Sequence, residues 1–504
     1  MDNFGVVALL PFILSIFFLL WKQDVILSLL GGLFLGAVLV FQFNPLVGFI
    51  NISGSVISNT LTNAENIYLL IMISESIILF SLLEKSGFLL SLRKLFTRWG
   101  KNDMRLQYLL FVSSSALFVE RNLSALLIGI FSKPFVDSKS ISTCKHAYLI
   151  NTVGASLWTL VPISTFLPVG VAAIGSAFGI LGISYSPLSA LYRSLAFQYY
   201  NIFSLFVALT TVILKKEILF MRRCESVSSG FQPISFGLDS PPAKQRPREL
   251  SLYGGAAAIF IFVATAVLLL SFKNVQYREW DFGSYQRTFI IALFSGIIFL
   301  FLFSLIAGTI SYNGYRTWKD RKGTLFLTMF YIILAMAMAV LARRLGLYSI
   351  IGFLRDAKLS YSLLPMLIFI GSSFVSFLSG SSLLTIATVT PLAVQITSLY
   401  LPHPLIIDNV MFASIAASFS GATFGDINSP LSPLFIISAA SAESPVLGHF
   451  TSQTGYSLIA FFVTIIFGYL FFLFGLKPYL SISTGMLAIF VCFMMINRGE
   501  NIFF

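Results

Sequence analysis

Charged residues are scarce in this chain: they make up 10% of its 504 residues, whereas hydrophobic residues make up 57%. A soluble domain usually carries about 25% charged residues, so a deficit spread over the whole length predicts a polytopic membrane protein. The formal net charge is nevertheless +12. In a membrane protein this excess indicates positive loops rather than nucleic-acid binding, because no soluble segment carries a basic patch with interleaved aromatic residues.

Cysteine and histidine are also rare, with three of each. Their spacing shows neither a metal-ligand motif nor a disulfide framework, so we expect no zinc centre. The chain has no Gly-rich phosphate loop of the GxxxxGK type, no catalytic triad and no soluble segment long enough for an ATPase domain. These absences predict a protein that is not an enzyme and binds no organic cofactor. Any transport would then be driven by an ion gradient, with Na+ or H+ as coupling ions.

Apolar runs, many of them near the roughly 20 residues that a membrane helix needs, predict an all-α protein with about 12–14 membrane segments. One sizeable hydrophilic segment divides them: residues 215–250 are rich in Ser, Pro and Gly and carry several Lys and Arg residues. We therefore expect a first membrane repeat at 1–214, a basic linker at 215–250 and a second membrane repeat at 251–504. The positive-inside rule places the linker in the cytoplasm.

The stretch 409–440 is deeply apolar, yet its sequence does not fit one continuous helix. The expected interruptions are Gly421, Gly425, Pro430 and Pro433. Asp426 and Asn428 lie at the centre of the stretch. Irregular backbone at membrane depth is tolerated only where protein buries it or where it lines a cavity. Broken helices of this kind hold substrate and coupling ions in secondary transporters, so we expect a transport site here.

The two halves of the chain resemble each other in the order of their features. Each has a polar break, at 118–124 and 379–385, followed by a proline and then by a helix of small residues that ends in Pro-x-Ser. The two Pro-x-Ser motifs are Pro162-Ile163-Ser164 and Pro430-Leu431-Ser432. This pattern predicts two inverted repeats whose broken helices and re-entrant hairpins meet near the bilayer midplane. The alternative is that any two membrane segments rich in Ser and Gly look alike.

Ionisable side chains inside a membrane segment cost roughly 2.5–3.5 kcal/mol each, so the few present are candidates for function. Asp426 is the foremost, because a carboxylate beside unwound carbonyls and hydroxyls suits a hard cation such as Na+, or a proton. Asn428, Ser429 and Ser432 would add neutral oxygen ligands. Alternatively, Asp426 caps the next half-helix by accepting hydrogen bonds from its backbone, which is compatible with a site.

Glu120 and Arg121 lie together at the first break and have three interpretations. Glu120 could carry a proton or cation beside Arg121, or Arg121 could bind an anionic substrate through its fork of donors. The two could also form an ion pair that only stabilises the broken helix. The other candidates are polar residues near the breaks: Ser124, Asn151, Thr152, Ser381, Ser382 and Thr385. These side chains could bind an ion or simply allow close helix packing.

Three segments carry a wider resemblance. They are LSALLIGIFSKPFVDSKSISTCKHAYLINTVGASLWTLVPIST at 123–165, FLSGSSLLTIATVTPLAV at 377–394 and FGDINSPLSPLFIISAASAESPVLGHFTSQTGYSL at 424–458. In the last, a Gly-Asp pair precedes Ser-Pro-x-Ser, then His449 and Ser452-Gln453. On these residues the chain resembles the NhaC-type Na+/H+ antiporters of bacteria, in the wider ion-transporter superfamily. The resemblance implies a secondary transporter of the bacterial inner membrane that works by alternating access, with Asp426 as a Na+ ligand.

The chain departs from the pattern of that family at three acidic positions, which here are Arg121, Asn151 and Pro433. Relatives of the family are also associated with the exchange of organic acids and amino acids. The added cation therefore supports a second hypothesis, an H+- or Na+-coupled carrier of a carboxylate or amino acid. The expected partners are the lipid bilayer, a small ion or organic solute and a second copy in a homodimer, with no nucleic acid.

Overall fold

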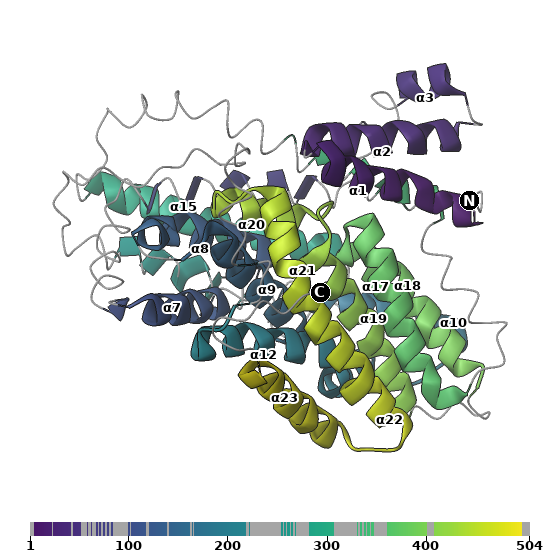
Figure 1. The fold of residues 1–504 in the computed structure, drawn as a ribbon. Coiled ribbons are helices and arrows are strands. Elements are labelled where there is room, and N and C mark those ends of the chain that lie inside the picture. The colour runs from purple at the N-terminus through teal and green to yellow at the C-terminus, as the bar shows by residue number, and fades with distance from the viewer. Residues whose placement is uncertain are drawn as a thin grey trace.

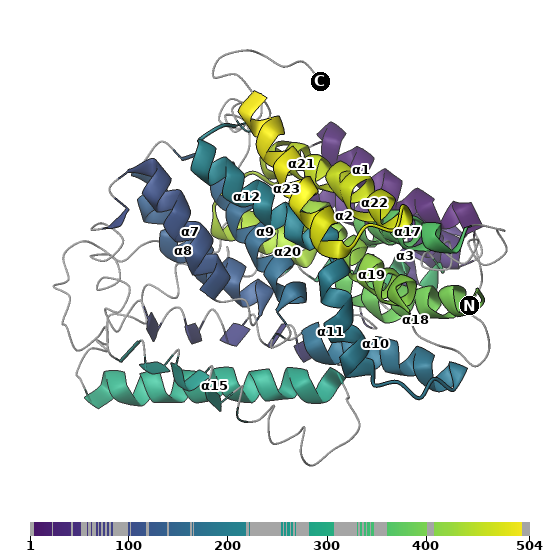
Figure 2. The ribbon, with the colours of Figure 1, turned by 90° about the horizontal axis from the view of Figure 1, so that it is seen from below.

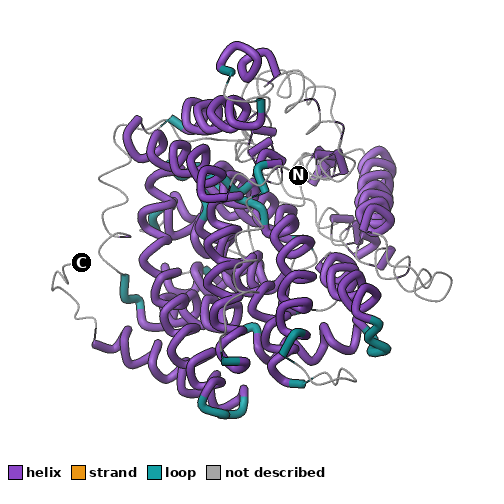
Figure 3. Tube along the Cα trace, turned by 90° about the vertical axis from the view of Figure 1, so that its right-hand side faces the viewer, coloured by secondary structure: helices purple, strands orange, loops and turns teal. Residues whose placement is uncertain are grey.

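The computed structural model describes residues 5–51, 99–217, 282–306, 360–400 and 408–495 apart from short gaps, and only scattered positions between these ranges. Within the described residues every regular element is a helix and no strand occurs (Figure 3). The expected all-α class is therefore confirmed. Nearly all of the basic linker 215–250 lies outside the described residues, so the division into two membrane repeats stays a prediction.

The described fold consists of two sets of helices, one before and one after the linker in the sequence (Figure 1). Before the linker these are η1 (Gly5–Leu9), α1 (Leu10–Lys22), α2 (Val25–Val40), α3 (Pro45–Asn51), α7 (Asp103–Ala116), α8 (Arg121–Asp137), α9 (Thr143–Leu160), α10 (Phe166–Leu181), α11 (Pro187–Ser194), η3 (Leu195–Phe197) and α12 (Tyr199–Leu214). After it they are α15 (Phe282–Ile306), η6 (Tyr361–Leu363), α17 (Leu364–Ser379), α18 (Ser382–Ser398), α19 (Asn409–Asn428), α20 (Pro433–Ser441), α21 (Val446–Val463), the π-helix η7 (Thr464–Leu470), α22 (Phe471–Leu473) and α23 (Pro478–Met495). Figure 2 shows α15 running along one edge of the molecule.

Hydroxyl caps and one glycine set the helix ends near the middle of the fold. Ser142 caps α9, and Ser381 caps α18 by accepting a hydrogen bond from the backbone N–H of Leu384 at 3.3 Å. Gly380, between α17 and α18, has φ +66°. Glycine adopts this left-handed conformation without the steric cost that a Cβ imposes. The structure thus places the break predicted at 379–385 at Gly380 and Ser381.

Helices α9 and α19 form the centre of the molecule, and nearly all their residues are buried. Both are rich in Ala, Ser, Thr and Gly, whose small side chains let neighbouring helices approach closely. Helix α17 packs along α19, while α7, α8 and α12 pack on α9. The two halves also cross over, since α8 packs on α20 and α10 packs on α18. The helix that follows each break therefore contacts the opposite half.

The stretch 409–440 is interrupted once, and not at its glycines. Helix α19 is unbroken to Asn428, and α20 begins at Pro433. The prediction that Gly421 and Gly425 interrupt the helix is therefore wrong. A Cβ at Gly421 would lie 2.6 Å from the Cβ of Ser372, and a Cβ at Gly425 would overlap Ser376, both on α17. These glycines are needed for close contact between α17 and α19 rather than for a bend.

The sequence also predicts that the apolar run 144–182 is broken around 151–156 and at Pro162 and Pro168, and that 189–214 forms one long helix. Three of these expectations change. Helix α9 runs unbroken through 151–156, where a break was expected. Pro168 lies in the first turn of α10, where a proline removes no hydrogen bond that the helix needs. The run 189–214, expected to form one long helix, is bent by 45° between Pro187–Phe197 and Tyr199–Leu214. The unexpected break therefore falls at Gln198.

The cysteines differ from expectation at one position. Cys144, at the start of α9, is disulfide-bonded in the structure, and the hydroxyl of Ser444 donates to its sulfur at 3.4 Å. The prediction of no disulfide framework is wrong for this residue, because spacing along the chain does not show which thiols meet in space. Cys492 of α23 is a free and exposed thiol.

Replacing Gly425 with alanine is expected to lower the free energy of unfolding by roughly 1–3 kcal/mol, because the added methyl overpacks the α17–α19 contact. The matched control is Gly179→Ala in α10, where an added Cβ meets nothing within 4 Å. The control should leave stability unchanged or raise it, since alanine favours a helix interior over glycine. Unfolding of the purified protein in detergent measures both variants. Equal changes in stability for the two variants would contradict the close contact between α17 and α19.

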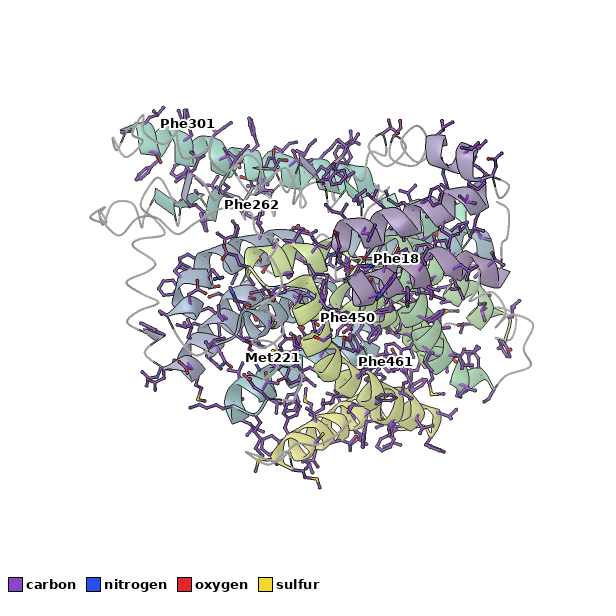
Figure 4. The ribbon with its side chains drawn as sticks, turned by 45° about the horizontal axis from the view of Figure 1, so that its top comes forward. Phe18, Met221, Phe262, Phe301, Phe450 and Phe461 are labelled. Atoms are coloured by element: carbon purple, nitrogen blue, oxygen red, sulfur yellow. The ribbon has the colours of Figure 1, made fainter. Side chains whose placement is uncertain are left out.

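Four described helices are long and apolar enough to cross a membrane, and the bent pair at Gln198 adds a fifth. The four are Tyr361–Ser379, Asn409–Asn428, Val446–Leu473 and Pro478–Met495. Apolar side chains of α15 are also exposed, such as Phe294 at 54% and Phe301 at 46%. Figure 4 labels Phe301 on this helix. Apolar helices with exposed apolar faces indicate a multi-pass membrane protein. The total of 12–14 segments stays a prediction.

Candidate functional site

Asp426 lies in the last turn of α19 and is buried, with 2% of its surface exposed. One of its carboxylate oxygens, Oδ2, forms an ion pair with Nη1 of Arg121. The same oxygen accepts a hydrogen bond from the hydroxyl of Ser382 at 2.5 Å. The other oxygen, Oδ1, accepts from the hydroxyl of Ser432 at 3.2 Å and from the backbone N–H of Ser382 at 3.4 Å. Four donors from three other helix ends thus converge on one carboxylate.

Arg121 is the first residue of α8 and is also buried, with an exposed fraction of 6%. Its Nη1 lies 2.6 Å from the hydroxyl of Ser382, and its guanidinium carbon lies 3.8 Å from the centre of the Trp158 ring. A guanidinium over an indole face is attracted by the ring quadrupole. The Nε of Arg121 finds no hydrogen-bond acceptor among the described residues. One donor of the guanidinium group is therefore unused in this conformation.

Three helices begin around the Asp426 carboxylate. Helices α8 and α18 begin at Arg121 and Ser382, and Ser432 is the N-cap of α20. Helix N-termini carry a partial positive charge, which favours a carboxylate there. The sequence predicts that Asp426 caps the next helix, α20, and the structure differs. Asp426 accepts one hydrogen bond from the backbone N–H of Ser382, the first residue of α18, and another from the hydroxyl of Ser432. It does not cap α20 through the backbone of that helix.

Equivalent features of the two halves meet at this point. Trp158 lies six residues before Ser164, whose hydroxyl donates to the Trp158 carbonyl oxygen. Asp426 lies six residues before Ser432, whose hydroxyl donates to the Asp426 side chain. Trp158 and Asp426 thus hold matching places near the ends of α9 and α19. Arg121 contacts both of them and pairs with Ser382, which begins the helix after the other break.

Asn151 lies on α9 beside the end of α19. Its amide donates to the backbone oxygen of Ile427 at 3.0 Å and to the side-chain oxygen of Gln453 at 3.2 Å. Gln453 of α21 donates to the same backbone oxygen at 2.5 Å. The side-chain amides of Asn151 and Gln453 therefore both donate to the backbone carbonyl of Ile427, the residue that follows Asp426. Thr152 is buried beside Asn151 in the sequence, and its hydroxyl has no partner among the described residues.

Asn428, Ser429 and Glu120 are buried near the same helix ends but have other partners. The Asn428 amide donates to the Tyr200 hydroxyl at 3.2 Å and to the Phe424 backbone oxygen at 2.9 Å. The Ser429 hydroxyl accepts from the backbone N–H of Leu431 at 3.2 Å and so stabilises the turn before α20. A carboxylate oxygen of Glu120 accepts from the Asn122 amide at 3.0 Å. The ion-pair partner that the structure gives Arg121 is Asp426.

The remaining candidates hold helix ends. The Ser381 hydroxyl caps α18, and the Thr385 hydroxyl donates back to the Ser381 carbonyl at 2.7 Å. The Ser124 hydroxyl donates to the Ser114 carbonyl at 3.2 Å and so ties α8 to α7. These bonds within and between helices do not reach the Asp426 carboxylate. Of the predicted residues, Arg121, Ser382 and Ser432 are the ones that contact the Asp426 carboxylate.

Sequence reasoning missed Trp158 as a site residue, and it missed the amides Gln198, Asn201 and Gln453. Trp158 is the one tryptophan that lies inside an apolar run, whereas the other four lie near the ends of such runs. The two amides at 198 and 201 interrupt an otherwise apolar run. Buried amides must find hydrogen-bond partners, so their presence was a usable signal. Within the described part of the chain, no group of three or more His, Cys, Asp or Glu side chains could hold a metal ion.

Comparison with known proteins gives two findings. A family model described as the Na+/H+ antiporter family matches residues 157–476, well over half of the chain. The matched region includes Trp158, Ser382 and Asp426 and begins after Arg121. A curated protein of Haemophilus influenzae, which is named only as an uncharacterized protein, is 21% identical over 489 residues. That similarity covers 89% of this chain and 88% of the relative.

Proposed function

This chain belongs to the Na+/H+ antiporter family, and from that membership we propose that it exchanges a monovalent cation, Na+ first, for protons by alternating access. It is a multi-pass membrane transporter of antiporter type and not an enzyme. The observation that carries the proposal is the buried ion pair between Arg121 and Asp426, which joins helices on opposite sides of the linker. An ion pair between the two halves can couple ion binding to movement of one half against the other.

The Asp426 carboxylate has three alternative partners in this mechanism: the Arg121 guanidinium, a cation or a proton. A cation that binds Asp426 must displace Arg121, because two positive charges in contact with one carboxylate repel each other. A proton on Asp426 removes the charge that holds Arg121. Cation and proton therefore compete for one group, which is the requirement for exchange. Each also frees α8 from α19, so that occupancy of the carboxylate shifts the conformational equilibrium.

We further propose that the two halves are inverted repeats. The order of elements supports this: α7, α8, α9 and α10 in the first half match α17, α18, α19 and α20 in the second. The crossed packing of α8 on α20 and of α10 on α18 supports it as well. In transporters built from inverted repeats, the site lies where the repeats meet near the bilayer midplane. On this proposal the Arg121–Asp426 pair lies at that interface.

A second candidate function is an H+- or Na+-coupled carrier of a carboxylate or amino acid. It is favoured by the Nε of Arg121, a buried donor with no acceptor among the described residues. Arginine binds carboxylates through two parallel hydrogen bonds. An organic anion would take the place of Asp426 as the partner of Arg121. For either function, we propose the bacterial inner membrane as the location, with residues 215–250 on the cytoplasmic side.

Reconstituted vesicles test the proposal. The full-length protein is placed in proteoliposomes with a pH-sensitive dye inside, and an acid-inside pH gradient is imposed. External Na+ or Li+ should dissipate the gradient within the protein-containing vesicles, whereas choline should not. Protein-free vesicles report leakage. A change in internal pH that requires a carboxylate or an amino acid, or Na+-dependent uptake of that solute, without a response to an alkali cation alone would establish the second function. No response of either kind would contradict both.

A further inference from the structure

The indole ring of Trp158 contacts Arg121 from within the same half of the chain. The ring is buried, and the Arg121 guanidinium carbon lies 3.8 Å from its centre. Trp158 lies on α9 and Arg121 begins α8, and these two helices pack on each other. Two further groups, the Asp426 carboxylate and the Ser382 hydroxyl, contact the guanidinium from the second half. Arg121 is thus held by an aromatic face on one side and by oxygen atoms on the other.

Neighbouring residues fix the position of the Trp158 ring. Phe166 of α10 contacts it edge-on, with ring centres 5.4 Å apart and ring planes at 62°. Phe166 in turn meets Phe419 of α19 at 4.9 Å and 85°. Edge-to-face contacts of this kind are favourable for aromatic pairs. The hydroxyl of Ser164 also donates to the backbone oxygen of Trp158 and holds the end of α9. The indole is therefore a fixed surface, whereas the guanidinium lies at the end of a long side chain.

The proposed exchange requires Arg121 to lose its counter-charge. When a cation or a proton occupies the Asp426 carboxylate, the guanidinium stays charged, because arginine does not lose its proton in proteins. It lies among buried groups, and an uncompensated buried charge is strongly unfavourable. A cation that displaces Arg121 must overcome this cost unless another group stabilises the free guanidinium.

An indole face can offset part of that cost. The ring attracts a cation to its face, most strongly for tryptophan and where water is absent. While Arg121 is paired, the Asp426 carboxylate neutralises most of the charge that the ring would attract, so the ring adds little. Once the pair is broken, the full charge of the guanidinium faces the ring. Trp158 therefore stabilises unpaired Arg121 more than paired Arg121, and this difference favours release of Asp426.

We propose that Trp158 is a positioning residue of the exchange site, which holds the Arg121 guanidinium against the first half while Asp426 carries a cation or a proton. The inference rests on the proposed cation exchange and assigns the place of Arg121 in the part of the cycle when the carboxylate is occupied. Arg121 then moves with α8 and α9, and Asp426 moves with α19. The ring sets how readily a cation displaces Arg121, so it tunes the affinity of the site without contacting the ion.

A double-mutant cycle of Trp158 and Asp426 tests this role without any transport. Unfolding of the full-length protein in detergent gives the stabilities of wild type, Trp158→Leu, Asp426→Asn and the double variant. Asp426→Asn leaves the guanidinium without a counter-charge, so the ring should contribute more in that background. We expect Trp158→Leu to raise the unfolding equilibrium constant at least about fivefold more there than in wild type, as a desolvated cation–π contact implies. A ring that only fills space would give equal increases in both backgrounds.

Two comparisons separate the effect of charge from that of packing. Trp158→Phe keeps a weaker aromatic face, so its coupling to Asp426→Asn should have the same sign and a smaller size. This variant keeps the cycle decisive if Trp158→Leu fails to fold. The matched control is Phe203→Leu in α12, because Phe203 is fully buried and stacks on the Tyr199 ring at 6.3 Å rather than on a cation. Its effect on stability should be the same in both backgrounds.

The vesicle assay then measures what the contact does in exchange. Trp158→Leu should raise the Na+ concentration for half-maximal dissipation about tenfold, because Arg121 is harder to displace without the indole. Trp158→Phe should raise it less. At saturating Na+ the rate of both variants should approach that of wild type, since a high cation concentration overcomes weaker binding. A role in packing alone would instead lower the maximal rate and leave the half-maximal concentration unchanged.

The two experiments distinguish failure of this inference from failure of the proposed function. Equal increases across the cycle, or a wild-type half-maximal concentration in Trp158→Leu, would overturn the role of Trp158 and leave cation exchange intact. Coupling in the cycle together with no Na+-driven dissipation by wild type would contradict the proposed exchange, while the hold of Trp158 on unpaired Arg121 would stand.

Discussion

Asp426→Asn is expected to abolish cation-driven proton movement in proteoliposomes while the protein still inserts and folds. Asparagine keeps the shape of the side chain and can accept from the hydroxyls of Ser382 and Ser432, but it can neither hold a cation by charge nor carry a proton. Losing a charged interaction worth roughly 3 kcal/mol corresponds to a loss of affinity of about a hundredfold. The measurement is the initial rate of gradient dissipation on addition of Na+.

The chain offers a matched control for this substitution at the other end of the same helix. Asp408 is the N-cap of α19, and its carboxylate accepts from the backbone N–H of Met411 at 3.0 Å and from the Tyr361 hydroxyl at 2.7 Å. Asparagine caps helices about as well as aspartate, so Asp408→Asn should transport at close to the wild-type rate. A near-normal rate for Asp426→Asn would remove Asp426 from the mechanism.

Arg121→Gln should be strongly destabilising, with a loss of about 3–5 kcal/mol in the free energy of unfolding. The reason is that it leaves the Asp426 carboxylate buried without its ion-pair partner, and an uncompensated buried charge is far costlier than a missing pair. The double variant Arg121→Gln with Asp426→Asn removes both charges and should recover most of that stability. It should still fail to exchange ions. Chemical or thermal unfolding in detergent gives the stabilities.

A surface ion pair supplies the comparison for Arg121. Lys133 contacts Asp137 at 2.5 Å and Glu443 at 3.3 Å, but its side chain is 16% exposed and that of Asp137 is 50% exposed. Pairs of this kind contribute about 0–1 kcal/mol because solvent screens them. Lys133→Gln should therefore be nearly neutral. If Arg121→Gln is equally mild, or if the double variant is less stable than either single one, the pair does not hold the two halves together.

The chemistry of the site was more accessible from the sequence than its geometry. Asp426 and Arg121 could be singled out because charge inside an apolar run is costly and therefore rare. Their pairing could not, since they lie on opposite sides of the linker and no local pattern shows which distant helices touch. Arg121 has an acidic neighbour in the sequence, Glu120, and that neighbour suggested a local pair. The structure instead shows a contact between the halves.

The helix breaks, too, could be predicted from the sequence only in part. Polar residues correctly marked the starts of α8 and α18, and Pro430 correctly marked the end of α19, because turn chemistry is local. Pro134 and Pro391 marked no helix end, since they lie inside α8 and α18.

The prediction of a helix break failed at Gly421 and Gly425. In a sequence, a glycine that allows close packing cannot be distinguished from a glycine that allows a bend. Only the approach of α17 distinguishes the two. The bend at Gln198 was missed because no proline or glycine marks it, and the amides of Gln198 and Asn201 bond to Thr159, which is distant in the sequence.

The crossed packing of α8 on α20 and of α10 on α18 bears on how the chain is made. During synthesis the first half enters the membrane before α18 and α20 exist. Until they arrive, Arg121 lacks its counter-charge and both α8 and α10 lack a covering surface. The nascent first half is thus an open intermediate, exposed to quality control until the second half closes over it. Its maturation is one late event rather than two successive ones.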